Sequence, residues 1–268
     1  MFYQEKFTKG GKIMENQVFE ALRKGKNIFI TGGAGVGKSY LSRKIKEKYE
    51  DMVMLASTGI AALNIGGSTV HSFFGIGKYS HPEDITKIFK SDKWNKIEKR
   101  INYASRYILI DEISMIRGDL LNLIDLVCRL AVTDTYKIRS SRLDLMTEVM
   151  KKPSFGGKTL IFVGDFLQLP PVVRNEEKDE VQALFAFESY AWKNASIKVF
   201  NLTEVKRQND ENFINALNAI RIGKTSKEFD DLFRATSKNE FPVKPIKLLP
   251  TNKKVELWND YELAQIQA

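Results

Sequence analysis

The sequence predicts an α/β protein in which a parallel sheet is flanked by helices. Apolar runs of strand length alternate with segments whose apolar residues recur at helical spacing, which is typical of parallel strand and helix units. The first run, residues 28 to 30, ends in a glycine-rich loop, and two later runs lead into carboxylates. Because ligands of open parallel sheets bind at the carboxyl ends of the strands, we expect a binding site at that edge.

Composition limits the class of protein. A chain of 268 residues, 43% of them hydrophobic, suits one large or two modest domains with a substantial core. The net charge of +9 is consistent with a polyanionic partner, although many basic proteins bind none. The chain shows no apolar run of the roughly 18 residues that a membrane helix needs and no signal-like N-terminus. We therefore expect a cytoplasmic, or nucleoid- or nucleus-associated, protein that does not enter a membrane.

Cysteine and histidine are scarce. The single cysteine, Cys128, excludes an internal disulfide, fits a reducing compartment and lies in an apolar helical stripe, as a core residue would. The only histidines are His71 and His81, too few for a zinc cluster. Mg²⁺ is the only metal that we expect.

Residues 28 to 39 read IFITGGAGVGKS and fit the pattern GxxxxGK[ST]. Glycines let the backbone turn so that successive N–H groups surround a phosphate, Lys38 adds a positive charge, and the Ser39 hydroxyl can bind Mg²⁺. The alternative is a glycine turn between unrelated elements. The strand before the loop and the helical pattern in residues 41 to 49 favour the phosphate loop.

A second predicted strand, residues 52 to 56, leads into Ser57 and Thr58, and more small polar residues occur in GGSTVHSFFGIG, residues 66 to 77. These groups could hold a phosphodiester backbone, but helix capping by Ser and Thr is the favoured interpretation of their type alone. Residues 78 to 101 are rich in lysine and interrupt the alternation of strands and helices. They predict a small inserted subdomain.

A third predicted strand, residues 107 to 110, ends in Asp111 and Glu112. Asp111 is suited to a Mg²⁺ ligand shell, and Glu112 to orienting or deprotonating an attacking water. An acidic pair after a strand can also simply cap a helix. The phosphate loop earlier in the chain favours the catalytic interpretation.

A fourth predicted strand, residues 160 to 163, leads into GDFLQLPPV, residues 164 to 172. Asp165 and Gln168 are suited to sensing a γ-phosphate or a water molecule. The prolines that begin at Pro170 stiffen the exit from this segment.

The last third of the chain predicts a strand at residues 197 to 202 and another at residues 246 to 249. Between them, Asp210 is placed to cap a helix that Gly223 ends. Arg207 is either a surface arginine or a finger directed at a γ-phosphate.

In this order, the segments resemble the Pif-type DNA helicases (the petite integration frequency family), which belong to the 5′–3′ group of superfamily one and are related to RecD. The resemblance covers most of residues 14 to 264. Its stretches are TGGAGVGKS, ASTGIAALNIGGSTVHSFFGIG, ILIDEISMI, FGGKTLIFVGDFLQLPPV, EVKRQNDENFINALNAIRIG and LPTNKKVELWN.

The resemblance implies a RecA-like P-loop NTPase fold, a small inserted wedge subdomain and part of a second RecA-like domain. The first motor domain would comprise residues 1–75 and 102–200, the wedge would comprise residues 76–101, and residues 201–268 would form the N-terminal part of the second motor domain. It also implies an ATP-driven motor that moves along single-stranded DNA and separates duplex or forked DNA. We expect it to act as a monomer.

The same resemblance assigns roles to residues. Catalytic roles fall to Lys38, Glu112, Gln168 and Arg207, of which Gln168 would sense the γ-phosphate. ATP would contact Gln17, Gly33, Ala34, Gly35, Val36, Gly37, Lys38, Ser39 and Tyr40, with Gln17 reading adenine. Mg²⁺ would be bound by Ser39 and Asp111. DNA would contact Thr58, Gly59, His71, Pro170, Thr251 and Asn252.

Two features depart from the family. Lys206 stands where an aromatic residue is expected, and the chain ends just after TNKKVELWN, where the family continues through the rest of a second motor domain. We therefore expect a fragment or truncated form.

Three functions remain open from the sequence. The first is a DNA helicase, or the motor portion of one. The second is a truncated module that binds nucleotide and DNA without productive unwinding. The third is a small-molecule kinase, which the GDFLQLPPV and Arg207 segments disfavour because they would have no role in it.

Overall fold

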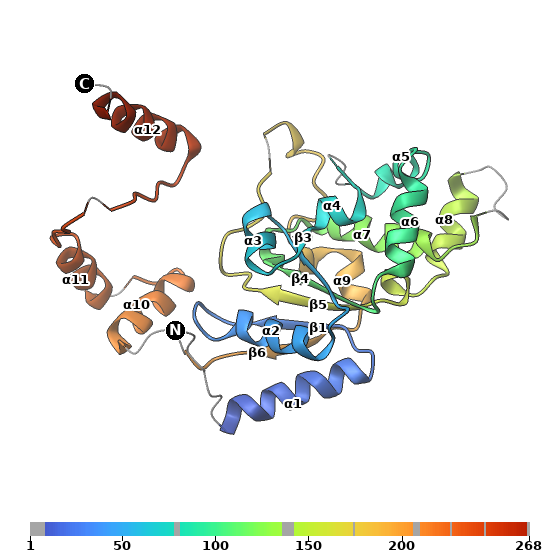
Figure 1. The fold of residues 1–268 in the computed structure, drawn as a ribbon, viewed down its shortest axis with the longest axis horizontal. Helices are drawn as coiled ribbons and strands as arrows, with labels where there is room; N and C mark the ends of the chain where they lie inside the picture. Colours follow the sequence, from blue (N-terminus) through green and yellow to red (C-terminus); the bar gives the residue numbers. More distant parts are fainter. Residues whose placement is uncertain are drawn as a thin grey trace. The chain divides into compact units, whose positions relative to one another are not determined.

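The computed structural model describes residues 9–77, 81–135, 142–173, 175–205, 210–225, 227–243 and 245–266. The chain divides into two compact units, one extending to Lys224 and the other beginning at Thr225. The first unit contains the sheet, and the second contains helices α11 and α12 (Figure 1). Each unit is described by itself.

The first unit is built on one six-stranded sheet in the order β3-β2-β4-β5-β1-β6, and every pairing is parallel. All strands therefore end at the same edge. The strands are β1 (Ile28–Thr31), β2 (Val53–Ala56), β3 (Ser68–Thr69), β4 (Tyr107–Asp111), β5 (Thr159–Gly164) and β6 (Lys198–Asn201). The predicted class, an α/β fold with a parallel sheet flanked by helices, is confirmed.

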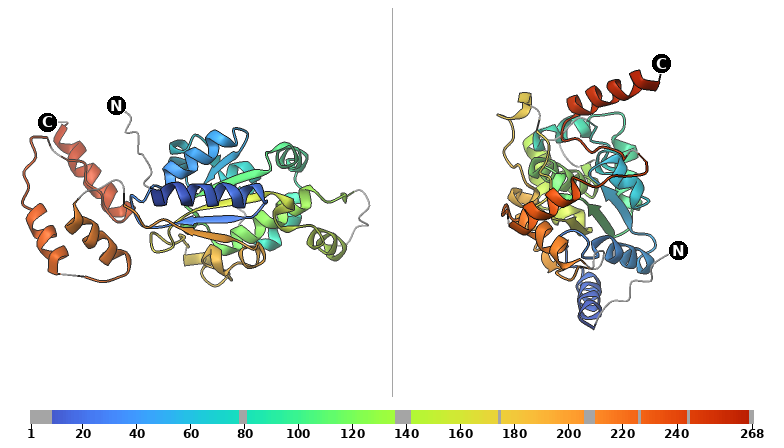
Figure 2. Two further views of the ribbon diagram at one scale, coloured as in Figure 1. Left: turned by 90° about the horizontal axis from the view of Figure 1, so that it is seen from below. Right: turned by 90° about the vertical axis from the view of Figure 1, so that its left-hand side faces the viewer.

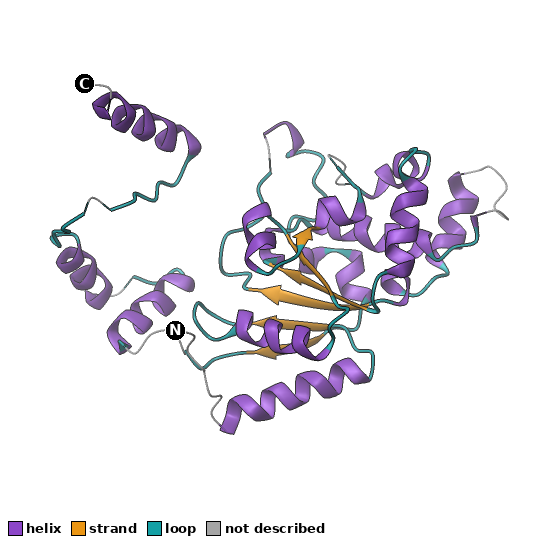
Figure 3. Cartoon of the chain, in the orientation of Figure 1, coloured by secondary structure: helices purple, strands orange, loops and turns teal. Residues whose placement is uncertain are grey.

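Side chains on the strands alternate between two apolar cores. Phe29 and Phe162 are paired in the sheet and face one core, whereas their neighbours Ile30 and Val163 are paired and face the other. This is the period of two that a strand imposes, and both faces are apolar because both are covered. Orange strands lie between purple helices in Figure 3, and Figure 2 shows the arrangement from two more directions.

Helices α1 and α2 pack on one face, and α4, α6, α7 and α9 contribute to the core on the other. The helices of this unit are α1 (Lys9–Arg23), α2 (Lys38–Lys48), α3 (Gly59–Asn64), α4 (Val70–Phe74), α5 (Ile85–Phe89), α6 (Trp94–Tyr103), α7 (Gly118–Ala131), α8 (Arg142–Met150), α9 (Tyr190–Asn194) and α10 (Glu211–Arg221). Short 3₁₀ helices are η1 (Pro82–Asp84), η2 (Ile113–Met115), η4 (Ser154–Gly157), η5 (Asn175–Glu177) and η6 (Ala186–Glu188). No helix among the described residues is long and apolar enough to cross a membrane.

The second unit contains α11 (Lys227–Thr236) and α12 (Asn252–Ile266). The strand predicted at residues 246 to 249 is wrong, because these residues have no regular structure and Ile246 and Leu248 are 92% and 95% exposed. An apolar run becomes a strand only when a neighbour satisfies its backbone, and the described part of this unit supplies no other strand. Strand β3, by contrast, was not predicted, because a strand of two residues shows no hydrophobic periodicity.

The described part of the segment predicted as an insertion, residues 81–101, lies within the first compact unit. It forms η1, α5 and most of α6, and Ile88, Trp94 and Ile97 are buried in the same core as α7. The predicted boundary at residue 101 falls inside α6, and the first compact unit extends beyond residue 200 to Lys224. The division into motor and wedge domains stays a prediction.

Helix α7 is buried along nearly its whole length and fixes the segments around it through polar side chains. Asp125 accepts hydrogen bonds from the Phe155 backbone N–H at 2.6 Å and from Arg129 Nε at 2.8 Å. Arg129 also donates to the Lys152 carbonyl. This buried pair therefore holds the turn that leads into β5.

We expect Asp125→Ala to lower the free energy of unfolding by about 3 to 5 kcal/mol, because it leaves the Arg129 charge buried without its carboxylate. Urea denaturation measures the change. Glu20→Ala breaks a matched pair four residues apart, Glu20 with Lys24, but that pair is exposed and should matter far less. Equal losses in the two variants would contradict this account of α7.

The side chain of Cys128 is fully buried in α7, as the sequence predicts. Burial raises the pKa of its thiol well above the usual range, so the reactive thiolate is suppressed.

Because Cys128 is the only cysteine, labelling of the chain reports on one site. We expect a thiol reagent such as iodoacetamide to leave the native protein unmodified and to label it once in denaturant, as mass spectrometry would show. Rapid labelling of the native chain would mean that α7 is not packed as described.

Candidate active site

The loop between β1 and α2 has the geometry of a phosphate-binding loop. Its backbone is left-handed at Gly35 and Gly37, with φ of 74° and 92°, and Lys38 begins α2. The Lys38 ammonium donates to the Gly32 and Gly33 carbonyls at 2.7 and 2.9 Å. The loop thus folds around the lysine that the sequence assigns to phosphate binding.

Gly32 lies so close to the strand beside it that it allows no side chain. Its φ is 145°, and a Cβ there would lie 2.2 Å from the Leu202 carbonyl oxygen. The start of the loop therefore lies close against Leu202, the residue that follows β6.

A cavity of about 240 Å³ opens at the loop. It is lined by Ala34, Gly35, Val36, Gly37, Lys38, Ser39, Tyr40, Arg43, Glu112 and Gln168. Seven residues predicted to contact nucleotide, 34 to 40, therefore surround one space together with two predicted catalytic residues. Gln17 lies on the exposed surface of α1 and is not in this lining. Its assignment to adenine stays a prediction.

The acidic residues lie where the sequence predicts, at the end of β4. The Glu112 backbone is left-handed, with φ of 53°, and its N–H donates to Asp111 Oδ1 at 2.9 Å. Burial raises the pKa of both carboxyl groups, and the Asp111 charge raises that of Glu112 further, whereas Lys38 opposes both shifts. Burial in turn lowers the pKa of Lys38, and the carboxylates oppose that shift. The charges of these groups therefore affect one another at the edge of the sheet where β1 and β4 end.

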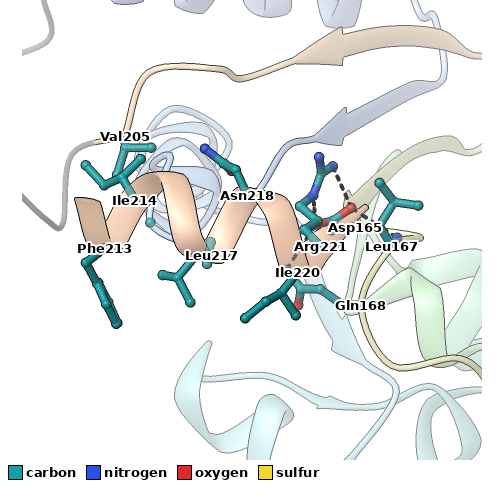
Figure 4. Close-up of a pocket in the computed structure, with 12 residues that line it drawn as sticks. Asp165, Leu167, Gln168, Val205, Phe213, Ile214, Leu217, Asn218, Ile220 and Arg221 are labelled. Atoms are coloured by element: carbon teal, nitrogen blue, oxygen red, sulfur yellow. Dashed lines mark hydrogen bonds and ion pairs between the residues drawn. The ribbon is translucent and has the colours of Figure 1, made fainter. Parts of the chain in front are cut away.

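Asp165 follows β5 and is 1% exposed. Arg221, from the last turn of α10, donates to it through Nε at 2.7 Å and through a terminal nitrogen at 2.9 Å (Figure 4). Burial acts to raise the pKa of Asp165, but hydrogen bonds from Arg221, Leu167 and Gln168 hold it below its usual value. Asp165 therefore keeps its negative charge within the fold.

Arg221 is a residue that sequence reasoning missed. The sequence predicted the helix that carries it, with Asp210 capping the Phe213 N–H at 3.0 Å and Gly223 following its end. Its partner, however, is 56 positions earlier, and no local pattern connects them. The Arg221–Asp165 pair can be found only when the positions of the ends of β5 and α10 in three dimensions are known.

A second cavity, of about 370 Å³, adjoins the first between α10 and the loop (Figure 4). It shares Ala34, Gly35 and Gln168 with the first cavity and is otherwise lined mainly by apolar side chains. Arg221 and Asp165 form part of its polar lining.

The residues predicted to contact DNA lie in several places. Thr58 caps α3 by accepting from the Ala61 N–H at 3.2 Å, so the capping role favoured by residue type is confirmed. Gly59 follows on the exposed start of α3, His71 is half-buried in α4, and Pro170 is exposed after β5. Burial and the Arg117 charge lower the pKa of His71.

The remaining predicted residues are not in the described part of the first unit. Thr251 and Asn252 are exposed at the start of α12, in the second unit. Arg207 and Lys206 lie outside the described residues. The roles assigned to Thr251, Asn252 and Arg207 stay predictions.

A glycine-rich loop between a parallel strand and a helix, with carboxylates at the end of a nearby strand, defines a P-loop nucleotide-binding protein of the α/β class. Comparison with known proteins narrows the class. Residues 8–231 match the model of the PIF1-like helicase family, and the chain belongs to that family.

Similar proteins include two ATP-dependent DNA helicases named PIF1. The chain is 37% identical to that of Candida albicans over 270 residues and 36% identical to that of Saccharomyces cerevisiae over 263, in each case covering 94% of this chain. It spans only 27% and 28% of those relatives.

Solved structures of Pif1 helicases are also similar to this chain. Pif1 helicase from Candida albicans matches with a TM-score of 0.72 at 32% identity, covering 99% of this chain and 55% of that one. Pif1 helicase from Bacteroides in complex with ADP-AlF3 and single-stranded DNA matches with a TM-score of 0.80 at 27% identity, covering 97% and 58%.

The loop geometry predicts different effects for two adjacent glycines. We expect Gly32→Ala to lower the free energy of unfolding by roughly 1 to 3 kcal/mol, because the methyl group collides with the Leu202 carbonyl at a strained φ. Gly33→Ala is the matched control, since a Cβ there meets only ordinary contacts of 3.6 Å and longer. Thermal or urea unfolding compares them, and equal stability would contradict the close approach at Gly32.

Proposed function

We propose that this chain is the nucleotide-hydrolysing motor portion of a DNA helicase that uses ATP and Mg²⁺ to move 5′ to 3′ along single-stranded DNA and to unwind duplex or forked DNA. The observation that carries the proposal is the meeting of Lys38, Glu112 and Gln168 around one cavity at the phosphate loop. Membership of the PIF1-like helicase family supports the choice of reaction.

In this proposal, the loop binds the phosphates through its backbone N–H groups, and Lys38 exchanges the Gly32 and Gly33 carbonyls for phosphate oxygens. Exchange is favourable because a phosphate carries a full negative charge, whereas a carbonyl carries only a partial one. The cost is small because the lysine stays within the same loop.

The residues that would hold Mg²⁺ have suitable chemistry. The Ser39 hydroxyl and the Asp111 carboxylate are hard oxygen ligands, and Ser39 lines the cavity while Asp111 lies beside Glu112 at the end of β4. When bound, Mg²⁺ neutralises charge on the phosphates.

Glu112 would act as general base. Burial and the Asp111 charge raise its pKa, which increases its affinity for a proton from the attacking water, and Lys38 opposes this shift. Gln168, across the same cavity, would contact the γ-phosphate or the water. Arg207 would supply a further positive charge to the transition state.

The proposed DNA path uses residues that follow the strand ends. Thr58, Gly59, His71 and Pro170 follow β2, β3 and β5, whose carboxyl ends share the edge that carries the nucleotide site. Their groups are small or uncharged, which suits contacts to a phosphate backbone without reading its sequence. The net charge of +9 favours a polyanion, and the similar Bacteroides helicase was solved with single-stranded DNA.

A second candidate is a module that binds nucleotide and DNA without productive unwinding. We consider this candidate because the chain spans only 27% and 28% of the PIF1 helicases of Candida albicans and Saccharomyces cerevisiae. In this candidate, the site that Lys38, Glu112 and Gln168 line would bind nucleotide without completing hydrolysis.

The two candidates differ in their response to DNA. We expect the chain to hydrolyse ATP slowly alone and at least about ten-fold faster with single-stranded DNA, and we expect Lys38→Ala to abolish both rates. A phosphate-release assay measures the rates, and binding of a fluorescent ATP analogue is measured alongside. Nucleotide binding that depends on Lys38 without any hydrolysis would refute the motor and leave the binding module.

A further inference from the structure

The Asp165 carboxylate joins two parts of the fold, the segment that follows β5 and the end of α10. One oxygen accepts from the Leu167 N–H at 3.2 Å and from a terminal nitrogen of Arg221 at 2.9 Å. The other accepts from Arg221 Nε at 2.7 Å and from Gln168 Nε2 at 3.3 Å. A single buried group thus holds the end of α10 and the side chain of Gln168 together.

This ion pair differs from an ordinary surface pair. The Asp165 side chain is 1% exposed, and Arg221, at 28%, covers it with both arms of its guanidinium fork. The planar fork matches the two carboxylate oxygens, a geometry that lysine cannot reproduce although it carries the same charge. Loss of the fork would leave a buried carboxylate poorly solvated and free to turn.

The orientation of Gln168 depends on that carboxylate. Gln168 is itself exposed, so its rotamer would be free without a fixed partner. Donation from Nε2 to Asp165 sets the plane of its amide and leaves the carbonyl oxygen and the second N–H for a ligand. Gln168 lines the cavity that Lys38 and Glu112 also line.

Helix α10 also lies beside the phosphate loop and lines a cavity with it. A Cβ at Gly33 would lie 3.6 Å from Asn218 Oδ1 and 3.7 Å from Arg221 Cδ. The stem of Arg221 therefore lies beside the loop, while its head binds Asp165 (Figure 4). Any shift of α10 would move Arg221 relative to both Asp165 and the loop.

We propose that Arg221 is a positioning residue for the hydrolysis of nucleoside triphosphate: through Asp165 it fixes Gln168 in the orientation that recognises the terminal phosphate. The inference rests on the proposed function, because it concerns the same site. It predicts that Arg221 matters for distinguishing a triphosphate from a diphosphate, and that it does so only while Gln168 is present.

The test measures binding rather than turnover. Equilibrium affinities for Mg²⁺ complexes of ADP and of the non-hydrolysable β,γ-imido analogue of ATP are determined for the wild type, Arg221→Lys, Gln168→Ala and the double variant. We expect the preference for the triphosphate to fall about ten-fold in each single variant, the loss expected for one charge-assisted contact. The double variant should fall no further than Gln168→Ala alone.

Several outcomes would overturn the inference: a wild type without preference, an unchanged preference in Arg221→Lys, or additive losses in the double variant. Failure of the proposed function is a separate result, namely an intact preference with no hydrolysis. Arg117→Lys is the matched control, since Arg117 forms an ion pair with Glu177 at 2.9 Å in the same unit, and it should keep the wild-type preference.

Folding is checked by thermal unfolding of every variant. If Arg221→Lys does not fold, Asp165→Asn supplies the same test, because an amide cannot accept the guanidinium fork at both positions. A folded Asp165→Asn variant with wild-type preference would overturn the inference.

Discussion

Burial of the sheet on both faces is the constraint on which the rest of the first unit depends. Because the side chains of the central strands β1, β2, β4 and β5 pack alternately into two cores, no interior position of these strands is left for chemistry. Reactive groups can lie only where strands end. Lys38 follows β1, Glu112 follows β4 and Gln168 follows β5, and the parallel topology brings all three to one edge without long loops.

The three carboxyl groups at that edge differ in the direction in which their pKa values are shifted. Asp165 receives the Arg221 fork and has a lowered pKa, whereas the pKa values of Asp111 and Glu112 are raised because burial outweighs the stabilisation that Lys38 provides. The first carboxylate is therefore a fixed structural anion. The other two favour binding a cation or a proton, which suits groups that must respond to a ligand.

The sequence predicted most strands and the phosphate loop because those signals are local: apolar runs bounded by glycines or carboxylates. It missed β3, which is too short for periodicity, and wrongly predicted a strand at residues 246 to 249, where the described neighbourhood offers no pairing partner. In the candidate site, residue type alone indicated the Thr58 cap. The Arg221 contact could not be predicted, because it depends on where two distant elements meet.

The alternation between two cores also limits how the length of this chain can change. Removing one residue from β4 would turn the side chains of Ile108 and Leu109 to the opposite faces of the sheet. Their packing beside the paired residues of β2 and β5 would then be lost. Insertions and deletions inside the central strands would therefore be lost, while connections such as the one that carries α5 and α6 can vary. Lineages of this fold should differ in length between the strands and agree within them.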